Sequence, residues 1–451
     1  MENREVLDIF DAQGRVANFY DLSMYEGLPK VGEANQELQK VALSFGLKTL
    51  RSSWKDFSAW DSRGHRISFG LSFSEESSPV SGVITSNKQL TRQFLETAEA
   101  AVPPGRTFRM SEVEAAVAYA AELGYPVVAK PLSGKSGSGV VANIGDEQGI
   151  RWAVEQISVL QEGRGRFIIE EHLDGQDYRI YVGYGEVLSV VVRQPASVTG
   201  DGVSTVAELV SAKNQIRRRN PHTRTRLIRK GEASTYRLQK QGLSWESIPA
   251  ADQHVVLASA ANISQGGDST EVLPETHPEI LDAAVRAVEA IPGLNQAGVD
   301  FLIRDHRIPL NEQNGGICEI NTTPALMANQ APVFGPVQPV AQKLVRAAAK
   351  TAGVRIKKPQ RRLAITVRAQ GVATPEKFTA WVVKHAQRLD LGGGIRVVGK
   401  EHVRLFLSGP LERVSALVTS MHSGNLSDQP DWVRTTHTSR DMPPQFQESM
   451  P

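Results

Sequence analysis

Oxygen-bearing side chains occur on two predicted strands in the second half of the sequence. Asp300 lies on a predicted strand at 298–303, and Glu319 and Asn321 alternate along 318–321. Because successive strand residues point to opposite faces, Glu319 and Asn321 share one face. Two carboxylates and an amide oxygen, with substrate phosphates completing the shell, suit Mg²⁺. A solvated strand face explains the Glu-x-Asn pair equally well, so both interpretations stay open at this point.

A second candidate for chemistry follows the predicted strand 126–129. Lys130 ends this strand and precedes a loop at 133–139 that is rich in glycine and serine and carries Lys135. Glycines can present backbone N–H groups to phosphate oxygens without obstruction by a Cβ. The spacing is not that of a P-loop. The segment is therefore either a phosphate-binding loop or a mobile surface loop.

The elements that would position these residues show mixed helical and strand patterns. Ser111 and Glu114 have capping-box spacing before a helical pattern at 113–123, and Gly124 can end that helix in a left-handed conformation. Another helix is expected at 280–291, before Pro292 and Gly293. Strands are expected at 140–144, 166–169, 179–183, 187–193 and 316–320. The fold class is α/β, with α+β parts.

Composition excludes several classes of protein. The 451 residues have a formal net charge of +2, which gives no indication of nucleic-acid binding. Cys318 is the only cysteine, so internal disulfides and cysteine-based zinc clusters are excluded; a buried strand residue is expected there rather than a nucleophile. No apolar run reaches the roughly 20 residues of a membrane span, and the first residues do not resemble a secretory signal. These features predict a cytoplasmic enzyme without a membrane partner.

The order of the chemical features resembles the ATP-grasp family over roughly 85–339. Within that family the chain is similar to the ligase domain of cyanophycin synthetase and to its glutathione-synthetase-like relatives. The segments that carry the resemblance are 167–177, 193–209, which contains a Gly-Asp-Gly-x-x-Thr run, and 261–267. The resemblance implies an ATP-grasp fold, ATP as a substrate, and Mg²⁺, with Mn²⁺ as an alternative.

The resemblance also implies roles for individual residues. Lys88 and Lys130 would contact ATP phosphates, with Lys130 also acting in catalysis, and Arg193 would stabilise the acyl phosphate and the tetrahedral intermediate. Glu170 and the backbones of Glu171 and Leu173 would meet adenine, and Asp177 would hold the ribose hydroxyls. The metal would be bound by Asp300, Glu319 and Asn321. The loop that closes over the phosphates would comprise Ser133, Gly134, Lys135, Ser136, Gly137, Ser138 and Gly139.

Two further stretches are candidates for substrate contacts. The basic segment 216–230, which includes Arg224 and Arg226, is either a solvated mobile loop or a site that captures an acidic substrate. A polar turn that could border the acceptor amine contains Asn262, Ser264, Gly266 and Gly267.

The C-terminal part has its own pattern, strand–helix–strand–strand–helix–strand, between 363 and 436. This order predicts a ferredoxin-like sandwich and resembles acylphosphatase. Pro375 and Val397 occupy the positions of the phosphate-binding Arg and water-orienting Asn of that family, so hydrolysis is not expected. Packing, dimerisation or shaping of the ligase site is the preferred role.

The predicted organisation is an N-terminal α/β domain (1–84), an ATP-grasp domain (85–352), a linker (353–362), an acylphosphatase-like domain (363–440) and a flexible tail (441–451). The predicted function is ATP-dependent ligation of an amino-acid or peptide carboxylate to an amino-acid amine. A phosphotransferase or a non-catalytic nucleotide-binding regulator is the alternative. The expected partners are amino acids or peptides, with a homodimer possible and no nucleic acid.

Overall fold

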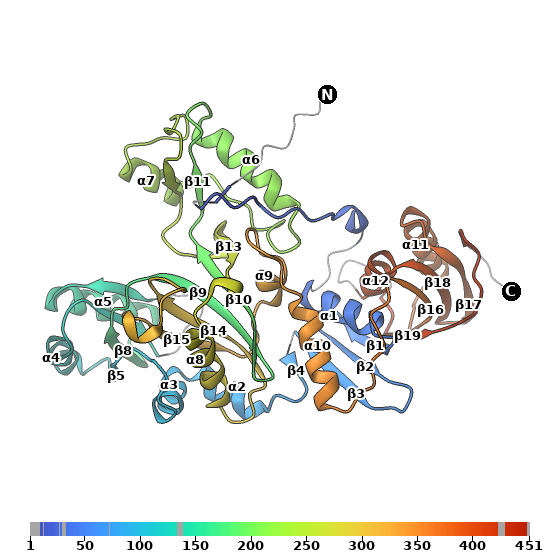
Figure 1. The fold of residues 1–451 in the computed structure, drawn as a ribbon, viewed down its shortest axis with the longest axis horizontal. Helices are drawn as coiled ribbons and strands as arrows, with labels where there is room; N and C mark the ends of the chain where they lie inside the picture. The colour runs from blue at the N-terminus through green and yellow to red at the C-terminus, as the bar shows by residue number, and fades with distance from the viewer. Residues whose placement is uncertain are drawn as a thin grey trace. The chain divides into compact units, whose positions relative to one another are not determined.

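The structure is a computed structural model that describes residues 10–11, 13–26, 28, 33–71, 73–132, 139–422 and 429–448. The chain forms two compact units, each built from separate segments (Figure 1). The first unit contains Met1–Glu75, Gln194–Glu271 and Ala325–Pro451. The second contains Glu76–Arg193 and Val272–Pro324. Each unit therefore joins stretches that are far apart in sequence.

The second unit begins with two helices and a four-stranded antiparallel sheet of order β5-β8-β6-β7. Two helices, α4 and α5, bury the apolar face of this sheet. The elements are α2 (Pro79–Ser86), α3 (Lys88–Thr97), β5 (Gly105–Arg109), α4 (Val113–Leu123), β6 (Val127–Pro131), β7 (Val141–Ile144), α5 (Glu147–Leu160) and β8 (Arg166–Glu171).

The strands that this unit contributes to its other sheet have the order β10-β9-β14-β15, and neighbours among them pair antiparallel. Its core includes apolar residues of α8 and of all four strands. The elements are β9 (Gln176–Gly183), β10 (Glu186–Gln194), η3 (Leu273–Glu275), α8 (Pro278–Glu289), β14 (Gln296–Ile303), η4 (Leu310–Glu312) and β15 (Gly316–Asn321). The helix and strands predicted for this region are confirmed, with shifts of a few residues at their ends.

One local prediction for this unit is wrong. The N-cap of α4 is Glu112 and makes no side-chain cap bond, so Ser111 and Glu114 do not form a capping box. The carboxylate of Glu112 instead accepts from the N–H of Arg109 at 2.6 Å. Gly124 does end the helix with a positive φ of 91°, although its ψ of 138° lies outside the left-handed helical region.

The first unit contains a nine-stranded sheet of order β20-β17-β18-β16-β19-β1-β2-β3-β4. The antiparallel pairing of β1 with β19 joins strands from the predicted N-terminal domain to strands from the predicted C-terminal domain. The N-terminal elements of this unit are η1 (Ser23–Tyr25), α1 (Glu33–Ser44), β1 (Lys48–Ser53), β2 (Asp56–Trp60), β3 (Arg66–Gly70) and β4 (Phe73–Ser74).

The C-terminal part of that sheet has the predicted strand–helix–strand–strand–helix–strand order. Helices α11 and α12 lie on one face of strands β16 to β19 (Figure 1). Apolar side chains of these helices and strands form one core. The elements are β16 (Arg362–Gln370), α11 (Pro375–Arg388), β17 (Gly392–Gly399), β18 (His402–Pro410), α12 (Leu411–Ser420) and β19 (Trp432–His437). This element order is that of a ferredoxin-like sandwich.

Residues 441–448 are the described part of the predicted flexible tail (441–451), and two of them pair with the nine-stranded sheet. Strand β20 (Phe446–Gln447) pairs in parallel with β17, and Phe446 is 4% exposed. The backbone N–H of Gly393 also donates to the carbonyl of Pro443 at 2.9 Å. Burial of the Phe446 ring therefore anchors this stretch against β17.

The remaining elements of the first unit form a smaller cluster and two connecting helices. Thr205 and Glu208 make a true capping box at the start of α6, with both reciprocal bonds present. The elements are β11 (Ser197–Thr199), α6 (Val206–Arg218), α7 (Glu232–Lys240), β12 (His254–Val256), η2 (Ile263–Gln265), β13 (Asp268–Glu271), α9 (Leu326–Gln330) and α10 (Val340–Thr351).

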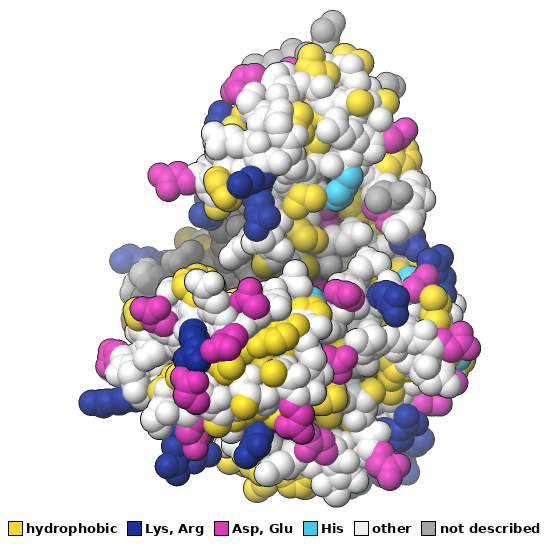
Figure 2. Space-filling view, turned by 90° about the vertical axis from the view of Figure 1, so that its left-hand side faces the viewer, with side chains coloured by type: hydrophobic (Ala, Val, Ile, Leu, Met, Phe, Trp, Pro, Cys, Tyr) yellow, Lys and Arg dark blue, Asp and Glu magenta, His cyan; other side chains and the backbone are white. Residues whose placement is uncertain are grey.

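The surface has no single dominant charge on the face drawn in Figure 2, where acidic and basic side chains are interspersed. This mixture agrees with the near-neutral formal net charge of the sequence. Within the described ranges, no helix is both long enough and apolar enough to cross a lipid bilayer.

Candidate active site

Charged side chains occupy one face of the β10-β9-β14-β15 sheet. Asp177 is the cross-strand partner of Arg193, and Arg179 is the partner of Asp300. Asp300 in turn lies opposite Glu319 on β15. Since residues in register on neighbouring strands point to the same face, the pairing brings together groups that are more than 100 residues apart in sequence.

Two arginines and two carboxylates form a connected network on this face. Arg179 Nε lies 2.5 Å from Asp300 Oδ1, and its NH2 group donates to Asp300 Oδ2 at 3.1 Å. Arg193 Nε donates to Asp177 Oδ1 at 2.8 Å, and its NH2 group lies 3.3 Å from Asp300 Oδ1. Asn321 Nδ2 donates to Asp300 Oδ2 at 3.3 Å. Asp300 is therefore the centre of the network.

A glycine leaves space for one of these arginines. A Cβ at Gly298 would lie 2.6 Å from NH1 and 2.9 Å from Cδ of Arg179. Non-bonded carbon atoms normally lie at least about 3.5 Å apart. Gly298 is two residues before Asp300 on β14, so the absence of its side chain lets the Arg179 guanidinium approach the carboxylate.

A second group of charges lines a pocket formed by α3, β6, β8 and β15. Glu170 lies between two cations: its Oε2 accepts from Arg92 at 2.6 Å, and its Oε1 pairs with Lys130 Nζ. The pocket is lined by Thr85, Lys88, Thr91, Arg92, Leu95, Val102, Lys130, Ile168, Ile317, Cys318, Glu319 and Ile320. Glu319 therefore connects this pocket to the network around Asp300.

The proximity of these groups appears in their pKa shifts. Burial and the ammonium of Lys130 lower the pKa of Lys88, while Glu319 and Glu170 oppose this effect. Burial raises the pKa of Asp177 even though Arg193 counteracts it. Burial lowers the pKa of Arg193, but Asp300 and Asp177 outweigh it and give a net increase. These shifts indicate a partly dehydrated site in which charges interact strongly.

Cys318 is among the residues that line the same pocket but does not have the properties of a nucleophile. Burial raises the pKa of its thiol to about 12. The thiolate is the reactive form, and a thiol with this pKa stays protonated at neutral pH. The prediction of a structural cysteine agrees with this environment.

The residues predicted to bind Mg²⁺ offer suitable donors. In the described parts of the chain, no three His, Cys, Asp or Glu side chains gather as a self-sufficient metal cluster. Asp300 and Glu319 nevertheless face each other across two strands, and Asn321 uses its Nδ2 toward Asp300, which leaves its Oδ1 for another partner. Carboxylate and amide oxygens completed by phosphate oxygens fit the preferences of Mg²⁺.

The other residues predicted to bind ATP are only partly described by the structure. Ser133, Gly134, Lys135, Ser136, Gly137 and Ser138 lie outside the described residues. Gly139 is described, with φ +74°. The N–H of Glu171 donates to the carbonyl of Pro104 at 2.9 Å, and its side chain accepts from Asn314 at 3.1 Å. Leu173 is 5% exposed.

The predicted substrate residues belong to the first unit. Arg224 and Arg226 lie 3.6 and 3.7 Å from carboxylate oxygens of Glu33. Asn262 accepts from Ser264 N and Oγ at 3.0 and 2.8 Å. Gly266 adopts a left-handed conformation, and the N–H of Gly267 donates to the carbonyl of Asn262 at 3.0 Å. The contacts within 262–267 stabilise a local turn, whereas Arg224 and Arg226 approach Glu33, which is far away in the sequence.

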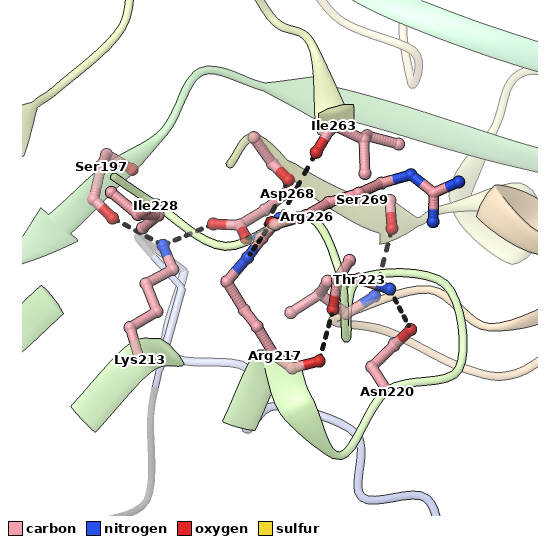
Figure 3. A network of polar contacts seen from close by, with 12 residues as sticks. Ser197, Lys213, Arg217, Asn220, Thr223, Arg226, Ile228, Ile263, Asp268 and Ser269 are labelled. Carbon is pink, nitrogen blue, oxygen red and sulfur yellow. Dashed lines mark hydrogen bonds and ion pairs between the residues drawn. The ribbon is translucent and has the colours of Figure 1, made fainter. Parts of the chain in front are cut away.

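The basic segment is more ordered than a solvated loop, because Arg217, near its start on α6, is fully buried. Arg217 is 0% exposed and pairs with Asp268 at 2.7 Å, and Lys213 pairs with the same carboxylate at 2.5 Å (Figure 3). Arg217 also donates to the carbonyl of Arg226 at 2.6 and 3.0 Å. The solvated-loop prediction is therefore wrong for Arg217, which holds the backbone of the segment.

Arg92 and Arg179 are site residues that the sequence prediction missed. Arg92 lies four residues after Lys88 on α3, and such residues share a helix face. Arg179 lies two residues after Asp177 on β9, and such residues share a strand face. Both spacings could have been found from the sequence, but their carboxylate partners could not.

Comparisons with known proteins show what this chain is similar to. Residues 87–177 match the family described as carbamoyl-phosphate synthase L chain, ATP binding domain. The chain contains an ATP-grasp domain, as the resemblance predicted.

Its relatives include two kinds of named enzyme. The glutathione biosynthesis bifunctional protein of Mannheimia succiniciproducens is 39% identical over 57% of this chain and 34% of its own length. Cyanophycin synthetase of a Synechocystis species is 32% identical over 60% of this chain and 31% of its own length. The chain thus spans about a third of the length of these curated relatives.

A solved structure is similar over most of the chain. The crystal structure of a bifunctional glutathione synthetase from Pasteurella multocida aligns with a TM-score of 0.60 and 30% identity. The alignment covers 74% of this chain and 45% of that chain.

Proposed function

We propose that this chain is an ATP-dependent ligase that joins a carboxylate to an amine. The observation that carries the proposal is the convergence of Lys88, Lys130 and Glu319 on one pocket, with Asp300 in register beside Glu319. Cations that can hold phosphates therefore lie next to oxygen ligands suited to a divalent metal. The named relatives, a glutathione biosynthesis protein and cyanophycin synthetase, support an amino acid or peptide as substrate.

The proposed reaction has two steps. A carboxylate oxygen of the acid attacks the γ-phosphorus of ATP, so that an acyl phosphate forms and ADP leaves. The amine then attacks the acyl carbon, the C–N bond forms, phosphate leaves and the amine loses a proton. These two steps replace the direct displacement of an oxide from a carboxylate with the displacement of phosphate, which is a better leaving group.

The side chains have distinct roles in this proposal. Lys88 and Lys130 bind phosphate oxygens, and Glu170 holds the ammonium of Lys130 in place. Arg193, which keeps its charge at all relevant pH values, stabilises the oxyanion formed when the amine attacks. Asp300, Glu319 and Asn321 would hold Mg²⁺, which when bound neutralises charge on the phosphates.

The function is tested by incubating the chain with Mg·ATP and pairs of amino acids or short peptides. We expect release of ADP and phosphate that requires both partners, together with a condensed product of matching mass. A phosphorylated product from a single acceptor would instead establish the alternative phosphotransferase. Nucleotide binding without turnover across a broad substrate panel would establish a non-catalytic regulator.

Arg193→Ala tests the assignment of the oxyanion-stabilising group. We expect it to bind ATP while amide synthesis falls by roughly 10²- to 10³-fold, the usual cost of losing one such donor. Arg286→Ala, a change at an exposed position on α8, is the matched control and should retain activity. Equal product yield from Arg193→Ala and the control would remove Arg193 from the mechanism.

A further inference from the structure

Four arginines face one another across four neighbouring strands of the nine-stranded sheet. Arg396 on β17 is in register with Arg404 on β18, and Arg404 with Arg368 on β16. Arg368 is in turn in register with Arg434 on β19. We call these four residues the arginine row. Because neighbouring strands lie about 4.8 Å apart, the row extends for roughly 14 Å across the sheet.

The arginine row lies on the face of the sheet opposite α11 and α12. Val367 and Ala369, which flank Arg368, belong to the core under these helices, as do Val403 and Leu405 around Arg404. Alternation along each strand therefore directs the arginines away from that core. Arg368 and Arg434 are exposed, and the two others are half-buried.

No described carboxylate balances this row. Among the residues that the structure describes, none of the four guanidinium groups makes an ion pair or a hydrogen bond. The Nε atoms of Arg396 and Arg404 are enclosed without a hydrogen-bond partner. Burial, together with the charges of Arg368 and Arg396, lowers the pKa of Arg404. Like charges directly opposite each other destabilise a sheet, so the row opposes folding in the absence of an anion.

The residues beside the row are mostly small or polar. Thr366 is two residues before Arg368 on β16 and is in register with Thr436 on β19. Gln370 is two residues after Arg368 and lies opposite His402 on β18. His402 Nε2 is also enclosed without a partner. Hydroxyl and amide groups beside a row of cations can hydrogen-bond to a peptide backbone whose side chains carry carboxylates.

We propose that the arginine row is a binding surface for an acidic polypeptide, one that carries several carboxylates within roughly 14 Å. Guanidinium groups bind carboxylates through two parallel hydrogen bonds, so each arginine can engage one acidic side chain. A row of this length matches several carboxylates rather than one small acid. This inference goes beyond the proposed ligase reaction and does not depend on it.

A polypeptide fits this surface better than a single-stranded nucleic acid. Surfaces that bind single strands combine cations with aromatic rings on which bases stack. Phe406, the ring next to Arg404 along β18, is 6% exposed, and the guanidinium of Arg440 lies 4.7 Å from its centre. That ring face is already occupied. Trp432, which is half-buried beside Gln370, is an aromatic ring on which a base can stack. An oligonucleotide is therefore included in the test.

The proposal is tested by fluorescence anisotropy of the full chain with labelled oligoglutamate, and in parallel with labelled oligothymidylate. We expect oligoglutamate to bind, and to bind more weakly as salt increases. The combined substitution of Arg368→Gln and Arg404→Gln should weaken this binding roughly tenfold, as expected for the loss of two ion pairs at the surface of the sheet. The control combines Lys377→Gln and Lys384→Gln on α11, which removes the same charge from exposed positions outside the row.

Thermal unfolding separates loss of binding from loss of structure. Because the substitutions relieve repulsion within the row, the Arg368/Arg404 variant should unfold at the same temperature as the parent chain or higher. Equal oligoglutamate affinity in this variant and in the lysine control would overturn the proposal. So would an absence of oligoglutamate binding by the parent chain, or a preference for oligothymidylate that the arginine variant loses.

Discussion

Arg179 and Asp300 are cross-strand partners on β9 and β14, and the Arg179 Nε lies 2.5 Å from Asp300 Oδ1. Asp300 is also the residue predicted to bind Mg²⁺, so an arginine and a metal would share one carboxylate. An arrangement of this kind orients the carboxylate and moderates its charge, as hydrogen-bonding partners of metal ligands commonly do.

Arg179 acts on catalysis through Asp300 and not through the substrates, so Arg179→Gln should impair turnover. We expect turnover to fall by roughly 10- to 100-fold, the usual effect of removing a group that orients a metal ligand. Arg179→Lys should recover part of the loss, because it restores the charge but not the forked geometry. The measurement is the Mg²⁺ dependence of ADP release; an unchanged curve for Arg179→Gln would contradict the role.

Gly298→Ala tests the same pair through packing. The new Cβ would lie 2.6 Å from NH1 of Arg179, so the guanidinium must move away from Asp300. We expect lower turnover and a destabilisation of roughly 1–3 kcal/mol, as for other overpacked sites. Gly145→Ala is the control, since a Cβ there meets no atom within 4 Å. Similar turnover and melting temperature for both variants would show that the space at Gly298 is not required.

Glu319→Ala tests the metal assignment. Loss of one of two carboxylates should abolish Mg²⁺-dependent turnover, while the free energy of unfolding changes little because Glu319 is half-buried and lines a pocket. Glu312→Ala, at an exposed position on η4, should behave like the parent chain. The measurement is ADP release across a Mg²⁺ titration, with thermal unfolding of both variants. Full turnover of Glu319→Ala at the usual Mg²⁺ concentration would remove it from the metal site.

Arg217→Ala should destabilise the first unit. Arg217 is 0% exposed, and its removal leaves the buried carboxylate of Asp268 with Lys213 alone. Breaking a buried ion pair costs about 3–5 kcal/mol. Arg218→Ala, at the neighbouring exposed position, should change the free energy of unfolding by less than about 0.5 kcal/mol. Urea unfolding of the two variants checks this prediction, and equal midpoints would contradict it.

His422 should make the stability of the first unit depend on pH. Burial, with a smaller effect from the charge of Arg51, lowers its pKa from 6.5 to about 4. The imidazole of His422 therefore becomes protonated below about pH 6.5 in the unfolded chain but only below about pH 4 in the folded chain. Protonation of His422 by itself should lower stability by about 3 kcal/mol as the pH decreases through this window.

The variant His422→Gln, which cannot be charged, should show a shallower decrease in stability over the same range. His222, whose pKa burial lowers to about 3, will maintain part of the slope. His65→Gln, at an exposed ring, is the control and should retain the full slope. Unfolding midpoints between pH 7 and pH 4 check the prediction. A slope for His422→Gln as steep as that of the parent would contradict it.

The sequence alone was sufficient for the features that depend on neighbouring residues. The order of elements from β16 to β19 is as predicted. The alternation of Glu319 and Asn321 places both on the strand face that also carries Asp300. These inferences succeed because the helical and strand periodicities are local properties of the chain.

Tertiary structure decided which distant residues meet. The pairing of Arg179 with Asp300 depends on β9 lying beside β14. The pairing of β1 with β19 places strands from the predicted N-terminal and C-terminal domains in one sheet. The sequence pattern favours a solvated position for Arg217, but the structure buries this residue against Asp268. The reason is physical: strand partners and burial are set by packing between distant segments, and many registers and neighbours are compatible with the same local pattern.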